Sequence, residues 1–332
     1  MRRFLFRNDR ALYRRVCGIC GKAILSNFSE DSSPSVYCPE CWWGDTWDSF
    51  QYSRDYDFSR PFFGQYQELV KEFPVLNAWN FNNERSDYTN YTGYSKNIYL
   101  AYSALYSENV FYSSIIDKSR DCVDCFKTRD SELCYWCADA VKAHNAYFLV
   151  NSRECINSRF LFDCVNCQNC FMSSNLRNKQ FYFKNRSLSK DEYERAIAQV
   201  DLGSYVSIQN LNKEFENLRR NSIHKFSNMT NTVHSSGDNL SNTKNTLSTF
   251  DSWNTENVKY CWRIYNYKDT YDVSGSLNSE LCYEASVAAD HNYESKFYTH
   301  SRSTSNIQYS HLCPDSSYVF GCIGPRTNRT AS

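Results

Sequence analysis

From Gly93 onward, small, apolar and polar side chains recur along the chain with a period of 12 residues. Four successive blocks begin at Gly93 and four comparable blocks begin at Ser241, and the two sets align without a gap. The fourth blocks read RDSELCYWCADA and LNSELCYEASVA. A period this short, without helical spacing, is typical of a solenoid whose coils stack equal positions in columns. The sequence therefore predicts a mainly β protein with a duplicated 12-residue-repeat β-solenoid, which continues to the chain end with one slip near Val141.

Two positions of the block carry small or apolar side chains that suit the inside of a narrow coil. Position six holds Ile98, Val110, Cys122, Cys134, Thr246, Val258, Thr270 and Cys282, and position nine holds Ala101, Ser113, Cys125, Cys137, Thr249, Cys261, Val273 and Ala285. Position five holds Asn97, Asn109, Asp121, Asn245, Asn257 and Asp269. Because Asn and Asp tolerate a left-handed backbone and bond to neighbouring amides, we expect a turn or an amide ladder at position five.

Helical spacing occurs in two stretches outside these blocks. In SLSKDEYERAIAQV, Ser189 and Glu192 have the spacing of a capping box, and a second amphipathic stretch follows Gly203. These stretches predict a helical hairpin that caps the first arm, although it could equally be an interaction arm. Earlier in the chain, Ser59 as a cap and Pro61 in the first turn predict a connecting helix.

The pattern divides the chain into five parts. They are a zinc ribbon (1–58), a connecting helix (59–80), a first solenoid arm (81–185), a helical hairpin (186–222) and a second solenoid arm (229–332). The sequence stops at GPRTNRTAS, where the first arm runs on into a helix. We therefore expect the cap of the second arm to be absent or supplied by a partner.

The ribbon prediction depends on two C-x-x-C knuckles, CGIC and CPEC, which contain Cys17, Cys20, Cys38 and Cys41. This spacing is typical of a structural zinc site, because each knuckle directs two thiolates at one tetrahedral ion. Four thiolates leave no open position for a catalytic water. The nearby Trp42, Trp43 and Trp47 are expected to bury the ribbon against its neighbour, or else to form a stacking platform.

The remaining cysteines lie in the repeats, and two interpretations are open for them. Cys122 and Cys125 share their block positions with Cys134 and Cys137, so they would stack one coil apart, at about 4.8 Å. They could form a second zinc site or a redox pair. We favour small buried side chains, because Ala, Ser, Thr and Val fill the same columns elsewhere.

Composition narrows the function classes. Lys+Arg and Asp+Glu are 37 each, so no overall charge attracts nucleic acid or an anionic membrane. Aromatic residues make up 17% of the chain, which favours packed strands. The apolar run at the start, FLF, is broken by Arg7, unlike a signal peptide, and no stretch approaches the roughly 18 apolar residues of a membrane span. We expect no membrane contact and a cytoplasmic protein, or a virion component if it is phage-encoded.

The ribbon, the repeats and the segment NCQNCFMSSNLRNKQFYFKNRSLSKDEY together resemble an uncharacterised family of zinc-ribbon proteins with Cys/Asn-rich repeats, found in bacteriophage and small-genome bacterial sequences. The resemblance covers almost the whole chain. Members typically read FGC before NLRNK, whereas residues 171–173 read FMS here and only residues 320–322 read FGC. Many cysteines of the family pattern are Ser, Thr or Ala in this chain, which speaks against an essential chemical role for them.

No phosphate-loop, dinucleotide-binding, zinc-protease or nucleophile-elbow motif occurs, so we expect no enzymatic activity and no small-molecule substrate. Two classes remain. The first is a zinc-containing structural or binding scaffold, possibly virion- or phage-associated, that presents its solenoid to a protein partner or to itself. The second is a nucleic-acid-binding accessory protein that uses the ribbon with Arg2, Arg3, Arg7, Arg10, Arg14 and Arg15.

Position eight of the block alternates large and charged side chains, so this face is expected to be exposed. In the first arm it is rich in aromatic residues. We expect Tyr112, Trp136, Phe148 and Phe171 to form an apolar strip that a partner covers, unless the hairpin or the other arm covers it already.

Overall fold

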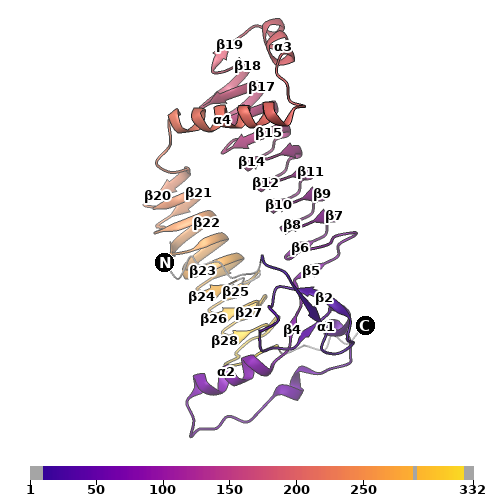
Figure 1. Cartoon of the computed structure of the whole chain (residues 1–332). Coiled ribbons are helices and arrows are strands. Elements are labelled where there is room, and N and C mark those ends of the chain that lie inside the picture. Colours follow the sequence, from indigo (N-terminus) through magenta and orange to yellow (C-terminus); the bar gives the residue numbers. More distant parts are fainter. Residues whose placement is uncertain (1–9, 287–289, 325–332) are drawn as a thin grey trace, which may run out of the picture.

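Figure 1 shows a computed structural model, which describes residues 10–286 and 290–324. Within these residues the chain is mainly β, with four α-helices and one short 3-10 helix. The expected mainly β class is confirmed. Two arms of stacked strands run side by side, a helical segment joins them at one end, and the N-terminal module lies at the other end (Figure 1).

The N-terminal module begins with an antiparallel hairpin of β1 (Tyr13–Val16) and β2 (Ala23–Ser26). It continues with β3 (Val36–Tyr37), α1 (Pro39–Trp43), the 3-10 helix η2 (Ser49–Tyr52), α2 (Phe62–Glu72) and β4 (Val75–Leu76). Strands β3 and β4 pair in parallel. The connecting helix is therefore present, but Pro61 occupies its N-cap. Ser59 does not cap it, because its hydroxyl donates to Asp57 instead.

The first arm is a sheet of short parallel strands that ends in one antiparallel pair. Its strands are β5 (Asn80–Phe81), β6 (Thr92–Gly93), β7 (Lys96–Tyr99), β8 (Tyr102–Leu105), β9 (Glu108–Phe111), β10 (Ser114–Asp117), β11 (Arg120–Val123), β12 (Phe126–Arg129), β13 (Glu132–Tyr135), β14 (Ala138–Val141), β15 (His144–Val150), β16 (Ile156–Phe162), β17 (Val165–Ser174), β18 (Arg177–Phe183) and β19 (Arg186–Ser187). Two columns, β6-β8-β10-β12-β14 and β7-β9-β11-β13, both continue into β15.

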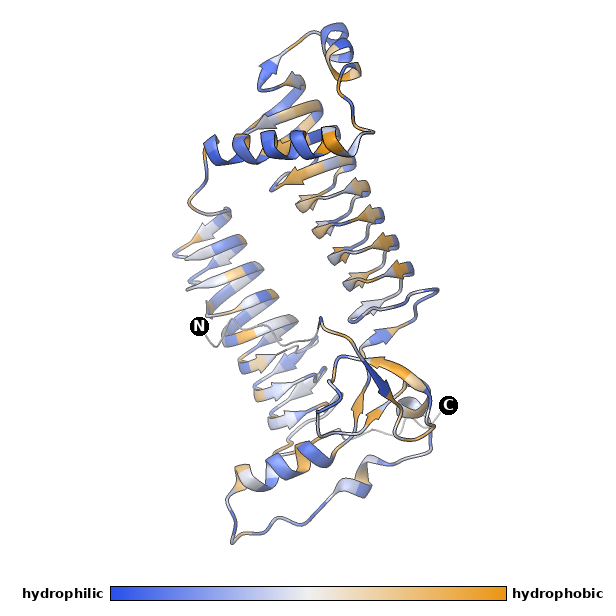
Figure 2. Cartoon of the chain, viewed as in Figure 1, coloured by the Kyte–Doolittle hydropathy of each residue, from blue (hydrophilic) through white to orange (hydrophobic). Residues whose placement is uncertain are grey.

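The second arm is a parallel sheet whose strands are mostly longer. They are β20 (Met229–Val233), β21 (Gly237–Lys244), β22 (Thr249–Lys259), β23 (Trp262–Glu280), β24 (Tyr283–Ser286), β25 (Asn292–Tyr293), β26 (Lys296–Thr299), β27 (Thr304–Ser305) and β28 (Gln308–His311). Figure 2 shows that the first arm is the more hydrophobic of the two, since Thr and Ser occupy many inward positions of the second.

Register partners in both arms lie mostly 12 residues apart, as between Cys122 and Cys134. The slip expected near Val141 is wrong, because Val141 bridges Arg153 and the 12-residue register continues through it. A slip of one residue lies in the second arm instead, where Tyr283 pairs with Lys296. The extra residue falls between these two partners.

The chain turns inward at every third residue. Left-handed backbone recurs at every third position from Asn82 to Lys184, and each coil presents four inward columns. Positions six and nine are buried as expected. Positions three and twelve, such as Ser107 and Ala104, are buried as well, although the sequence had not indicated it. The Ser107 hydroxyl is satisfied there, because it donates to the Leu105 carbonyl (2.7 Å) and accepts from the Ser119 amide (3.2 Å).

Position five forms amide ladders in both arms. Asn97 donates to Asn109, and Asn109 donates to Asp121, over 2.9 and 2.7 Å. The longest ladder, in the second arm, starts at Asn231 and ends at Asp290. An Asp suits the last place, since a carboxylate accepts but does not donate. These residues also have left-handed backbone, so the turn and the ladder coexist.

Two helices separate the arms, namely α3 (Lys190–Ala198) and α4 (Tyr205–Asn221). The capping box of Ser189 and Glu192 is present at the start of α3. Phe215 of α4 is 1% exposed and packs on Phe160 of β16, with ring centroids 5.6 Å apart. The helical segment therefore covers one face of the last coils of the first arm.

The end of the second arm is covered by the N-terminal module. Phe62 of α2 lies 4.8 Å from Phe320 between ring centroids, and Phe73 shares a buried cluster with Leu312 and Ile323. The expectation that this cap is absent or supplied by a partner is therefore wrong for the described residues. The sequence could not reveal it, because the capping residues lie some 250 positions earlier in the chain.

Candidate metal centre and binding surfaces

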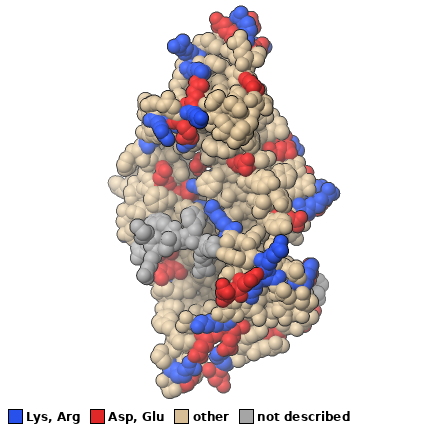
Figure 3. Space-filling model, in the orientation of Figure 1, with Lys and Arg blue, Asp and Glu red and all other residues tan. Residues whose placement is uncertain are grey.

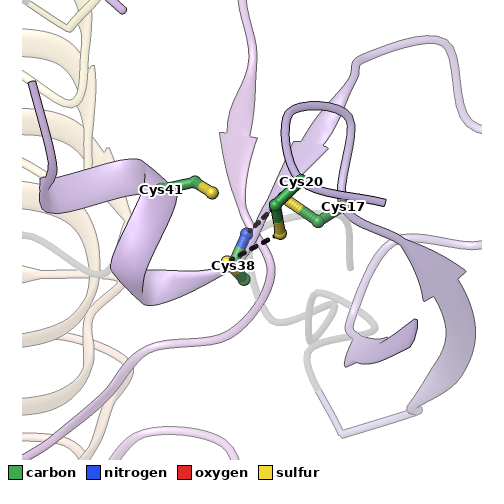
Figure 4. A group of neighbouring side chains, drawn as sticks. All are labelled: Cys17, Cys20, Cys38 and Cys41. Carbon is green, nitrogen blue, oxygen red and sulfur yellow. Dashed lines mark hydrogen bonds between the residues drawn. The ribbon is translucent and has the colours of Figure 1, made fainter. Parts of the chain in front are cut away.

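Two short turns bring the four N-terminal cysteines together (Figure 4). Cys17 and Cys20 lie in the turn between β1 and β2, where Gly21 has a φ of 73° and its amide donates to the Cys17 carbonyl (3.0 Å). Cys38 is the N-cap of α1, and Cys41 lies within that helix. The four sulfur atoms all lie within 4.8 Å of one another.

The donor set and its geometry fit a zinc ion. Tetrahedral coordination with Zn–S bonds of about 2.3 Å requires sulfur atoms about 3.8 Å apart. The Cys20 and Cys38 sulfur atoms lie at 3.8 Å. The Cys38 amide also donates to the Cys17 sulfur (3.4 Å), which is a second-sphere contact of the kind that orients a thiolate. The four cysteines would hold the ion, which would supply a structural crosslink.

The local field already favours one thiolate. Burial opposes ionisation of Cys17, but backbone amides of Cys20, Cys38 and Ile19 outweigh it and lower its pKa to about 6. Burial raises the pKa of Cys38 and of Cys41. Without a cation, four neighbouring thiols cannot all ionise, because like charges at this separation repel. A divalent cation removes this conflict.

The tryptophans of the ribbon divide between the two expected roles. Trp42 and Trp47 are buried and pack at a centroid distance of 5.0 Å, and the Trp47 Nε1 donates to the Cys41 carbonyl. Trp43 is exposed. Burial of the metal site against α2 therefore accounts for two of the three rings.

The repeat cysteines are buried inside the arms as free thiols. Cys122 and Cys134 donate to the carbonyls of Arg120 and Glu132, at 3.4 and 3.5 Å. Among the described residues, the ribbon cysteines form the one cluster that is compact enough to hold a metal. These observations favour the packing role over a second metal site.

The expected aromatic strip is only half exposed. Tyr112 and Trp136 are 55% and 39% exposed, as expected. Phe148 and Phe171 are buried at 4% and 1%, which contradicts the prediction for them. They share a cluster with Phe160 and Phe215 beneath α4. The sequence placed them on the correct face, but it could not show that α4 covers this part of the face.

The basic N-terminal stretch has several functions within the fold. Arg2, Arg3 and Arg7 lie outside the described residues. The Arg15 guanidinium donates to the carbonyls of Ser29 and Pro34 and so closes the ribbon loop. Arg10 stacks over the ring of Tyr102 in the first arm, at 4.9 Å. Arg14 is exposed.

An open furrow of about 680 Å³ runs along the first arm, lined by positions two, three and four of four blocks between Tyr94 and Glu132. Small serines at position three form its floor between longer neighbours. Basic and acidic side chains alternate on its walls, as in the ion pair of Arg120 with Glu132. Sequence reasoning missed this furrow, because position three was not recognised as inward-facing.

Comparison with known proteins gives one weak likeness. No family model and no curated protein matches the chain. Among solved structures, it resembles a protein from Desulfovibrio desulfuricans G20 that is described as a "putative acetyltransferase". The two are 10% identical, the match covers 70% of this chain and 66% of that chain, and the TM-score is 0.13. A TM-score this low carries no argument about fold or reaction.

The expectation of a protein without enzymatic activity is corrected here, because a solved structure described as an acetyltransferase is among its matches. We therefore do not maintain the absence of activity as a conclusion. In the described part of the chain, no helix is long and apolar enough to cross a membrane.

Proposed function

We propose that this protein is a zinc-containing structural or binding scaffold, in which two β-solenoid arms present their outer faces to a protein partner or to a second copy. The observation that carries the proposal is the position of the N-terminal module. The module contacts the last turns of the second arm and leads directly into the first arm, so it acts as a clamp between them (Figure 1).

Contacts between the arms support a rigid frame. Trp79, at the start of the first arm, stacks on His300 of the second arm, with ring centroids 5.5 Å apart. The Tyr91 hydroxyl lies 2.8 Å from the His300 Nε2. Further along, Arg129 lies over the ring of Trp253. A surface held by contacts along its length loses little entropy on binding, which is useful in a scaffold.

The surface chemistry favours a protein partner. Tyr112 and Trp136 are exposed on the first arm, and aromatic side chains of this kind are enriched at binding hot spots. On the face shown in Figure 3, basic and acidic groups are interspersed without a single-sign patch. Such a face suits a neutral protein surface better than a phosphate backbone. The resemblance of the ribbon and repeats to phage and small-genome bacterial sequences supports a virion or phage role.

Nucleic-acid binding remains the second candidate, with less support. Arg14 is exposed, but Arg15 is committed to backbone carbonyls of the ribbon loop. A mobility-shift titration with mixed DNA and RNA separates the candidates. The scaffold proposal expects no shift at physiological salt, whereas nucleic-acid binding expects a shift that weakens with salt and with Arg14→Ala.

The scaffold itself is tested by crosslinking mass spectrometry in cells that produce the protein. We expect recurrent crosslinks from lysines of the first arm, such as Lys118, to one protein or to a second copy. Combined Tyr112→Ser and Trp136→Ser changes should remove these crosslinks. A matched change at exposed Tyr205 of α4 should retain them. Crosslinks that are absent, or that persist in the double variant, contradict the proposed binding face.

A further inference from the structure

The two arms have four ends, and described segments of the chain cover three of them. At the start of the first arm, the amides of Val75 and Asn77 donate to ribbon carbonyls, at 2.9 and 3.0 Å. At its far end, β18 pairs with β19, and Phe181 packs on Tyr193 of α3. The last turn of the second arm lies against Phe62.

The fourth end, at β20, is an open edge. Strand β20 pairs in parallel with β21, from Met229 opposite Leu240 to Val233 opposite Lys244. It is the terminal strand of its sheet, and no other strand of the described chain pairs with it. Figure 1 shows β20 at the end of its arm, where the connection from α4 leads into it. An edge strand of this kind offers unpaired backbone donors and acceptors.

The side chains at this edge do not discourage pairing. Residues 226–233 read FSNMTNTV and contain no charged residue and no proline. Phe226 is fully exposed, and Ile223 and Val233 are 77% and 51% exposed. The first turn of the other arm, residues 80–87, reads NFNNERSD and carries charges. Charges and prolines are the usual means of keeping strand edges apart, and β20 lacks both.

We propose that β20 pairs antiparallel with β20 of a second copy across a two-fold axis, which joins two second arms into one continuous sheet. This inference deepens the proposed scaffold, and rests on it, by naming one partner and its contact. A second copy fits because an identical uncharged strand brings no charge against the edge and supplies matching backbone donors and acceptors. The same approach would cover the exposed Phe226.

The test uses paired charge variants of the full-length zinc-loaded protein. A positive variant carries Thr230→Lys and Val233→Lys, and a negative variant carries Thr230→Glu and Val233→Glu. Both positions are exposed, so the fold should tolerate either change. A control carries Tyr205→Lys and Val206→Lys on exposed positions of α4. Circular dichroism and thermal melting show whether each variant remains folded.

Light scattering after gel filtration should give twice the 39.0 kDa of one chain for the wild type and for the control. Each single-sign variant should be a monomer. A mixture of the positive and negative variants should regain the dimer mass, because opposite charges then face each other across the axis. This rescue requires that both partners contribute the same edge.

A wild-type protein that is monomeric at every concentration overturns the inference, whether the edge stays open or another segment or protein covers it. Single-sign variants that fold and remain dimeric overturn it as well. These outcomes are separable from failure of the scaffold proposal. A monomer that keeps its crosslinks at Tyr112 and Trp136 contradicts the β20 contact alone, and a dimer without those crosslinks contradicts the binding face alone.

Discussion

Lys127 of the first arm forms an ion pair with Asp251 of the second arm, with the Lys127 Nζ 2.7 Å from the Asp251 Oδ2. The carboxylate is largely buried, and it also accepts from the Trp262 Nε1 and the Asn239 Nδ2, both at 2.9 Å. Residues 124 positions apart in sequence are thus joined at the junction of the arms. The contact is a direct link between the two halves of the duplication.

Removing the lysine should weaken this junction. Lys127→Met leaves the buried Asp251 carboxylate without its cation, so we expect a loss of about 2 kcal/mol in the free energy of unfolding. Urea denaturation measures it. The double variant with Asp251→Asn should lose less than the sum of the two single changes, because the charge is then also removed. Strict additivity would contradict the coupling of the arms at this pair.

The metal site predicts about one zinc ion per chain. Cys17→Ser combined with Cys38→Ser should abolish binding, because two of four thiolate ligands are lost. Elemental analysis of the purified protein measures it. Full retention of zinc in this variant would place the metal on the repeat cysteines.

The repeat cysteines provide the complementary prediction. Cys122→Ala combined with Cys134→Ala should leave the zinc content unchanged and unfolding cooperative. The loss should be about 1 to 3 kcal/mol per site, since a buried sulfur is removed. Urea denaturation together with metal analysis tests this. A fall in bound metal would refute the packing role.

The covered part of the aromatic strip predicts a contrast between two positions. Phe160 is fully buried and stacks on Phe148 at 4.4 Å, so Phe160→Ala should cost about 3 to 5 kcal/mol. Tyr112→Ala, at an exposed position, should change stability by no more than about 0.5 kcal/mol. Equal losses at the two sites would show that α4 does not cover the strip.

Acid should loosen the link between the first arm and α4. Burial opposes ionisation of Asp163, but Lys225, Arg177 and Asn175 donate to it and hold its pKa below the ordinary value. A depressed folded-state pKa stabilises above the unfolded pKa of about 3.9, and this stabilisation is lost as pH falls through the folded value. Asp163→Asn should therefore flatten the fall of unfolding free energy below about pH 4. The exposed Asp124→Asn serves as control, and an equal effect there would contradict the assignment.

What the sequence could predict depended on whether the determining contacts were local. The ribbon cysteines were found because a knuckle and its spacing lie within a few residues. Positions six and nine were found because Cys, Ala and Val mark them as interior. Positions three and twelve were missed because Ser and Thr, as at Ser107 and Thr128, are buried there with their hydroxyls satisfied by the backbone or packed in the coil.

The errors came from contacts between distant segments. Phe148 and Phe171 occupy the expected face, but α4 folds back over them. The last turn of the second arm is covered by Phe62 and Phe73, which no local pattern connects to it. A period along the chain predicts which residues stack, but it does not predict which element lies on the stack.

The central claim is that the zinc module clamps the end of the second arm and so holds the frame together. Hydrogen–deuterium exchange with and without a zinc chelator tests it most directly. We predict that chelation accelerates exchange of the last-turn amides of His311, Gly321 and Gly324, which donate to carbonyls of neighbouring coils. Amides of β9 to β13 should keep their protection. Unchanged exchange at the three last-turn amides after zinc is removed would contradict the account.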